Sequence, residues 1–194
     1  LILTAFLAGM LAVPLVIPFE KVFNDYFGNG TLVFIIWATV EELAKFVAAW
    51  AIVLRRKEVD EPIDALIYMI TVALGFSAIE NSLFILAPIA GGDAVGALIT
   101  GNLRFIGATL LHVISSSAIG AAIALSFYQS AKIKKELVIA GVILSISLHA
   151  IFNLLIIKSA DNGGTFFVFL SVWLVVTVLM VVFEKVKSLA IRHY

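Results

Sequence analysis

The sequence predicts an all-α fold, a polytopic bundle of about six transmembrane helices that forms a single domain over residues 1–194. Hydrophobic residues make up 62% of the chain and charged residues 13%, whereas soluble domains are about half apolar and about a quarter charged. Six apolar stretches reach the length of about 20 residues that a helix needs to cross a bilayer. None shows β-barrel alternation, and a continuous apolar run in lipid must be helical to pair its backbone groups.

We expect the six helices near residues 2–19, 31–54, 63–87, 102–128, 137–157 and 165–183. The first stretch lacks a charged leading region and a clear small-residue cleavage site, so we interpret it as a transmembrane helix and not as a signal peptide. The start of the fourth helix is open, because "AVGALIT" can belong to the helix or to a re-entrant segment. The polar breaks "RRKEVDEP", "QSAKIKK" and "KSADNGG" bound the other helices.

Positive charges predict the orientation. With six helices, nine Lys and Arg residues fall on one side and only two, Lys21 and Lys158, lie in the loops of the other side. The nine are Arg55, Arg56, Lys57, Lys132, Lys134, Lys135, Lys185, Lys187 and Arg192. Because cytoplasmic loops carry the excess of Lys and Arg, we expect the C-terminus to be cytoplasmic. We interpret Arg104, near the opposite surface, as an interfacial anchor.

Ionisable residues inside four of the predicted helices fall at a similar depth. At a rise of about 1.5 Å per residue, Glu41 and Glu42 lie about 16–18 Å from the outer end of their helix, and Glu80 lies about 12 Å from its own. His112 and His149 lie about 15 Å and about 13 Å from theirs. We therefore expect one polar layer in the outer half of the bilayer.

The cost of this layer favours a functional cavity. Lys45 follows Glu41 by four residues and Glu42 by three, which places all three on one arc of the helix. Three carboxylates and a lysine at about 3 kcal/mol each approach a whole folding stability, so we expect them to line a hydrated, mutually satisfied cavity. Two alternatives remain: a non-catalytic scaffold whose polar layer ties helices together, and a proton-coupled transporter that uses the same Glu/His layer.

The sequence excludes several kinds of catalytic site. The chain has no cysteine, and therefore no thiolate nucleophile and no cysteine-ligated zinc. Neither His112 nor His149 begins an HExxH zinc motif. The segment "GFSA" departs from the GxSG of rhomboid serine proteases, and "AGGD" departs from the GxGD of presenilin-like aspartyl proteases. No phosphate loop is present, and we expect no nucleic-acid partner.

The remaining polar residues suit hydrolysis. A buried glutamate can take a proton from water, and imidazole and carboxamide N–H groups can stabilise the oxyanion of a tetrahedral intermediate. Two histidines and one carboxylate also make a plausible open zinc site with three protein ligands. The residues alone leave both chemistries open.

Four motifs in order resemble the PrsW family of intramembrane proteases, which is related to the type II CAAX prenyl endopeptidases. They are EExxK at 41–45, FxxxEN at 76–81, a histidine on a later helix at 112, and HxxxN at 149–153, and they lie within about residues 35–157. The CAAX enzymes have EExxxR and FxxxH instead. The resemblance implies a multi-pass protein of a prokaryotic cell membrane, surrounded by lipid, that cleaves a membrane-anchored protein near the outer face. PrsW-type enzymes remove the outer part of an anti-sigma factor in this way.

The resemblance also suggests a role for each motif residue. We hypothesise that Glu42 is the general base for water and that Glu41 shares its proton, with the reverse assignment as an alternative. His149 and Asn153 would form the oxyanion site, and His112 would position water or protonate the leaving amine.

Glu80 has two candidate roles in this scheme. It would orient a histidine or, together with His112 and His149, bind Zn²⁺. Lys45, Asn81 and Ser116 would support the site. Zinc-dependent and metal-free hydrolysis both remain open.

Overall fold

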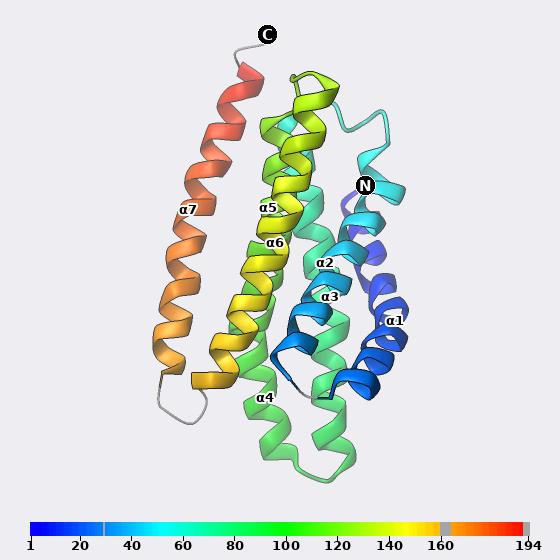
Figure 1. The fold of residues 1–194 in the computed structure, drawn as a ribbon, viewed down its shortest axis with the longest axis vertical. Helices are drawn as coiled ribbons and strands as arrows, with labels where there is room; N and C mark the ends of the chain where they lie inside the picture. The colour runs from blue at the N-terminus through cyan, green and yellow to red at the C-terminus, as the bar shows by residue number, and fades with distance from the viewer. Residues whose placement is uncertain (29, 160–163, 192–194) are drawn as a thin grey trace.

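The computed structural model describes residues 1–28, 30–159 and 164–191 (Figure 1). This part of the chain is helical and contains no strand, which confirms the predicted all-α class. The elements are α1 (Ile2–Phe27), α2 (Thr31–Ala49), the π-helix η1 (Trp50–Leu54), α3 (Pro62–Ala90), α4 (Ala94–Ile106), α5 (Ala108–Leu125), α6 (Ala131–Ser159) and α7 (Thr165–Ile191).

Five helical segments within the described ranges are long and apolar enough to cross a membrane. They are Ile2–Phe27, Pro62–Ala90, Ala94–Leu125, Ala131–Ile156 and Phe166–Leu189. The sixth predicted span corresponds to α2 and η1, which together have the length but include Glu41, Glu42 and Lys45. These segments support a multi-pass integral membrane protein.

Several helix boundaries differ from the sequence-based expectation: α6 begins at Ala131 instead of near 137, and α7 ends at Ile191 instead of near 183. The first helix continues past residue 19 to Phe27. The segment "AVGALIT" is helical, and the expected helix 102–128 is divided into α4 and α5 at Gly107. A Cβ added to Gly107 would come within 2.6 Å of the Phe169 ring on α7, so a larger residue at this junction would require that ring to shift. The predicted break near 158–165 includes residues 160–163, which lie outside the described residues, as does Arg192.

α3 is the central helix of the bundle. It packs against α1 and α5, and α5 packs against α6 (Figure 1). A Cβ added to Gly9 of α1 would collide with a backbone carbonyl of α3, and one added to Gly75 of α3 would collide with a backbone carbonyl of α1. Reciprocal glycines of this kind let two membrane helices approach to backbone contact. Ser77 of the "GFSA" segment donates to the Leu74 carbonyl of its own helix (3.2 Å).

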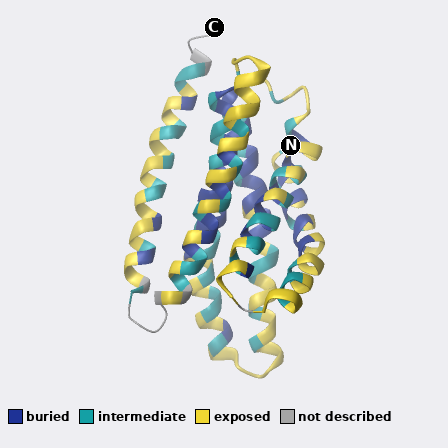
Figure 2. Cartoon of the chain, in the orientation of Figure 1, coloured by how far each residue is buried: buried dark blue, intermediate teal, exposed yellow. Residues whose placement is uncertain are grey.

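The edges of the bundle are more exposed than its centre. α7 stands at one side, and most of its residues are exposed or only partly buried, whereas buried residues gather on α3 and α5 (Figure 2). The hairpin of α3 and α4 extends beyond the ends of the other helices at the lower end of Figure 1. Gly92 turns this hairpin with a φ of 81°, which is a left-handed conformation that glycine adopts without strain.

Candidate active site

Five ionisable side chains from three helices meet inside the bundle. Glu41, Glu42 and Lys45 come from α2, His112 from α5 and His149 from α6, and each is at most 5% exposed. Buried charges are costly unless each finds a partner and its remaining hydrogen bonds are satisfied. The hydrogen bonds around these groups therefore decide what each of them can do.

Glu42 is held on both of its carboxylate oxygens. Its Oε1 accepts from Lys45 Nζ at 2.6 Å and from His149 Nδ1 at 2.7 Å. Its Oε2 accepts from the hydroxyls of Ser116 and Ser145, each at 2.8 Å. Four donors from α2, α5 and α6 occupy this carboxylate, which makes Glu42 a cross-link between helices.

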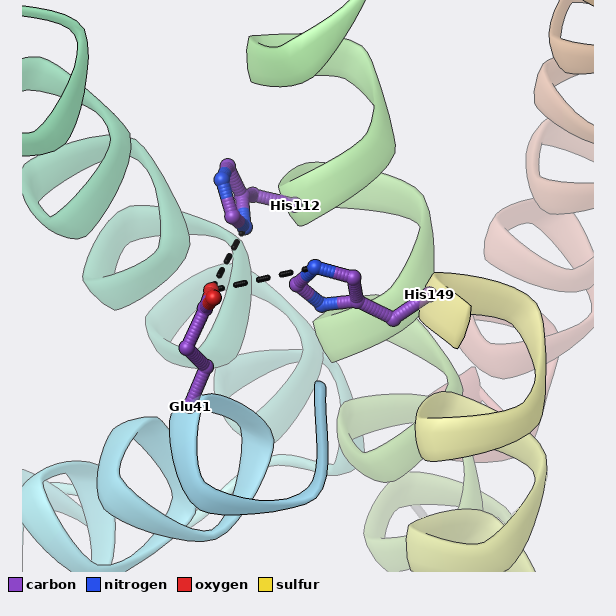
Figure 3. Close-up of side chains that lie close together, drawn as sticks. All are labelled: Glu41, His112 and His149. Atoms are coloured by element: carbon purple, nitrogen blue, oxygen red, sulfur yellow. Dashed lines mark ion pairs between the residues drawn. The ribbon is translucent and has the colours of Figure 1, made fainter. Parts of the chain in front are cut away.

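Glu41 is placed differently. Its Oε2 is buried and has no hydrogen-bond partner among the described residues. This oxygen lies 3.7 Å from each of Lys45 Nζ, His112 Nδ1 and His149 Nε2. Figure 3 shows the carboxylate and the two imidazoles pointing toward one another. Glu41 therefore has an oxygen available for a ligand, a proton or a water molecule.

The hydrogen bonds determine the tautomer of each histidine. An ammonium group can only donate, so Lys45 Nζ donates to His112 Nδ1 at 2.8 Å. The proton of His112 is therefore on Nε2, which donates to Glu80 Oε2 at 2.8 Å. His149 donates from Nδ1 to Glu42, and in the neutral ring the lone pair of its Nε2 is then directed at Glu41 Oε2. Three acceptor atoms, Glu41 Oε2, His112 Nδ1 and His149 Nε2, consequently lie close together.

This convergence fits a metal ion. Oxygen and nitrogen ligand atoms of Glu41, His112 and His149 lie within 4.8 Å of one another. Ligand atoms around a tetrahedral or trigonal zinc at about 2.1 Å are about 3.4–3.7 Å apart, close to the 3.7 Å separations seen here. The second nitrogen of each histidine is bonded to a carboxylate, as is usual for metal-bound imidazoles. Lys45 would have to release His112 Nδ1 for that nitrogen to bind a metal.

A cavity of about 300 Å³ lies next to this group. Its polar walls are Glu41, Glu80, Arg104, His112, His149 and Asn153, and its aromatic walls are Phe34, Trp37 and Phe84. Glu42 and Lys45 are not among the lining residues. A volume of this size holds several water molecules, and Glu41 is the α2 carboxylate that faces them.

The other predicted site residues surround this centre. Glu80 bonds His112 on the side away from Glu41 and is not part of the Glu41, His112 and His149 group. Asn153 lines the cavity one turn after His149. Asn81 donates to the Thr109 hydroxyl (3.0 Å).

Sequence reasoning missed three residues near the site. Ser145 lies one turn before His149, and this spacing was the available signal. Arg104, expected as an interfacial anchor, forms an ion pair with Glu80 at 2.7 Å. Glu20 interacts electrostatically with Glu41, and only the extension of α1 to Phe27 places it on a helix at this depth.

Comparison with known proteins identifies the family. The chain is 27% identical over 158 residues to a protein from Clostridioides difficile (strain 630) named Protease PrsW, covering 78% of this chain and 65% of that protein. The chain thus spans slightly less than two thirds of the length of this relative. No solved structure matches the chain. The model of the PrsW family of intramembrane metalloproteases matches residues 1–183, and the chain therefore belongs to this family.

Proposed function

We propose that the protein is an intramembrane endopeptidase that hydrolyses a peptide bond of a membrane-anchored protein. One observation carries the proposal: the unbonded oxygen of Glu41 and the Nε2 lone pair of His149 face each other beside a polar cavity inside an apolar helix bundle. Family membership supports peptide hydrolysis as the chemistry. The comparisons do not favour the transporter alternative.

The cavity provides the parts that metal-free hydrolysis needs. Glu41 accepts a proton from water, the resulting hydroxide adds to the peptide carbonyl carbon, and the amine leaves after the proton is passed to it. Asn153 can donate from its carboxamide to the developing oxyanion. We assign the base to Glu41 instead of Glu42, because four hydrogen bonds already occupy Glu42.

The same residues can serve a metalloprotease. Glu41, His112 and His149 would hold the ion, with Glu41 in place of the Glu80 suggested by the sequence. When bound there, zinc supplies a Lewis acid for the scissile carbonyl and for the attacking water. Glu42 and Glu80 then orient the two imidazoles through their second nitrogens.

We also propose how the site is placed in the membrane. The excess of positive charge at one end of the bundle predicts a cytoplasmic C-terminus, and the polar layer then lies in the outer half of the bilayer. A single-span protein with an external domain is the fitting substrate. An anti-sigma factor of a prokaryotic cell membrane belongs to this class.

The test compares variants of two adjacent glutamates, Glu41 and Glu42. The purified protein is reconstituted with a single-span reporter that carries an external tag, and cleavage of the reporter is measured. Glu41→Gln should reduce cleavage at least about 100-fold and lower thermal stability less than Glu42→Gln does, because Glu41 Oε2 makes no hydrogen bond and lies 3.7 Å from Lys45. Glu42→Gln should lower stability as well as cleavage. Glu184→Gln, on an exposed glutamate of α7, is the matched control. Wild-type rates in Glu41→Gln would refute the assignment.

Metal analysis separates the two mechanisms. A metalloprotease should purify with about one ion per chain, lose that ion in His149→Gln, and lose activity on chelation. Cleavage that persists after complete removal of the metal would exclude the zinc mechanism and leave Glu41 as the base.

A further inference from the structure

We propose that Arg104 is a positioning residue, which holds Glu80 on the Nε2 proton of His112 and thereby keeps Nδ1 unprotonated beside Lys45 and Glu41. Its catalytic consequence rests on the proposed function. The positioning itself does not, and it can be measured without any substrate.

The guanidinium of Arg104 is bonded at two points. Its Nη2 donates to Glu80 Oε2 at 2.7 Å, and its Nε donates to Asn81 Oδ1 at 2.9 Å. The two acceptors are consecutive residues of α3, whereas Arg104 belongs to α4. This planar two-point contact is one that arginine makes and lysine does not.

An aromatic ring supports the same group. The guanidinium carbon lies 3.6 Å from the centre of the Phe84 ring, one turn of α3 beyond Glu80. Three α3 side chains therefore fix the orientation of Arg104, whose side chain is only 21% exposed. An interfacial anchor has no need of such a defined set of partners.

Arg104 acts on His112 through one oxygen atom of Glu80. Glu80 Oε2 accepts from Arg104 Nη2 and from His112 Nε2 at the same time. On the opposite edge of the ring, Lys45 Nζ donates to Nδ1. The imidazole thus has an acceptor at Nε2 and a donor at Nδ1. This arrangement permits only the neutral tautomer that carries its proton on Nε2.

Arg104 keeps Glu80 hydrogen-bonded to His112 Nε2. Glu80 is 20% exposed and borders the same cavity as the carboxylate of Glu41, so like-charge repulsion and access to water both favour its rotation away from the ring. Pairing with the fixed guanidinium opposes that rotation. Without it, only Lys45 opposes the other tautomer, and Lys45 has Glu42 as a second acceptor, so we expect Nδ1 of His112 to carry the proton part of the time.

Nitrogen NMR of the purified protein, with ¹⁵N-labelled imidazoles, tests this directly. His112→Gln assigns the resonances of residue 112. Wild type should show a protonated Nε2 and an unprotonated Nδ1 at this residue. Arg104→Met should show a mixture of tautomers, and Arg104→Lys an intermediate ratio, because lysine keeps the charge and loses the two-point contact. Lys21→Met removes an exposed outer cation and should leave the spectrum unchanged.

A wild-type tautomer ratio in Arg104→Met would overturn the proposal. If that variant does not fold, a wild-type ratio in Arg104→Lys would overturn it equally. Kinetics adds a second readout: Arg104→Met should lower kcat about 10–100-fold with little change in KM. Addition of Arg104→Met to Glu80→Gln should cause no further loss of kcat, since both changes remove the same constraint. Failure of wild type to cleave any reporter would refute the proposed function while the NMR result would still decide the role of Arg104.

Discussion

Replacement of Lys45 by methionine should be the most destabilising single change in the site. Lys45 is fully buried, donates to Glu42 at 2.6 Å and to His112 at 2.8 Å, and lies 3.7 Å from Glu41. Its ammonium also lies 4.5 Å from the centre of the Phe76 ring. Methionine has a similar length but no charge, so Lys45→Met leaves two carboxylates in the interior without a compensating cation.

Loss of one partner of a buried ion pair costs about 3–5 kcal/mol in free energy of unfolding. The exposed Glu184–Lys187 pair of α7 has the same i,i+3 spacing as Glu42–Lys45, with an N–O distance of 3.3 Å and both side chains more than half exposed. Lys187→Met should therefore cost about 0–1 kcal/mol. The Glu42–Lys45 and Glu184–Lys187 pairs have equal sequence spacing, but loss of the lysine should cost more unfolding free energy in the first pair because that pair is buried.

Reversible unfolding in detergent, followed by circular dichroism, measures both variants. The double variant Lys45→Met/Glu42→Gln should recover part of the loss, because it removes a charge of each sign together. A loss below about 1 kcal/mol for Lys45→Met would contradict the buried network. Equal losses for Lys45→Met and Lys187→Met would contradict it as well.

Three further predictions concern packing, the serine donors and the metal. Gly75→Ala should destabilise the α1–α3 contact by about 1–3 kcal/mol in the same unfolding assay, whereas Gly30→Ala, where the new Cβ meets nothing within 4 Å, should not. Ser116→Ala and Ser145→Ala should each cost about 1 kcal/mol, and the double variant, which leaves Glu42 Oε2 unbonded, should lose more than the sum of the two. If a metal is bound, His149→Gln should weaken binding at least about 10-fold by calorimetry, and unchanged affinity would refute that ligand.

The sequence predicted the helices better than their junctions. Apolar length and the absence of alternation were sufficient for the class, since lipid leaves the backbone few choices. At Gly107, where α4 and α5 divide, the Phe169 ring of α7 lies close to the backbone, and no local sequence pattern encodes this contact. The extension of α1 to Phe27 passes through charged and polar residues that the hydropathy criterion had assigned to a loop.

Within the site, helix spacing indicated which residues would be near one another but not how each is bonded. Glu41 and Glu42 are adjacent and chemically identical, so only the donors on other helices show that Glu42 is occupied and that Glu41 faces the cavity. Arg104 could not be assigned from position alone, because its partners on α3 are 23 and 24 residues away in sequence.

The four donors on Glu42 also set a condition on biogenesis. Two of them, Ser145 and His149, belong to α6 and lie 103 and 107 residues further along the chain. A nascent polypeptide that has inserted only its first helices therefore holds the acid without half of its partners and lacks one imidazole beside Glu41. Under the proposed function, we therefore expect cleavage activity only after α6 has entered the bundle.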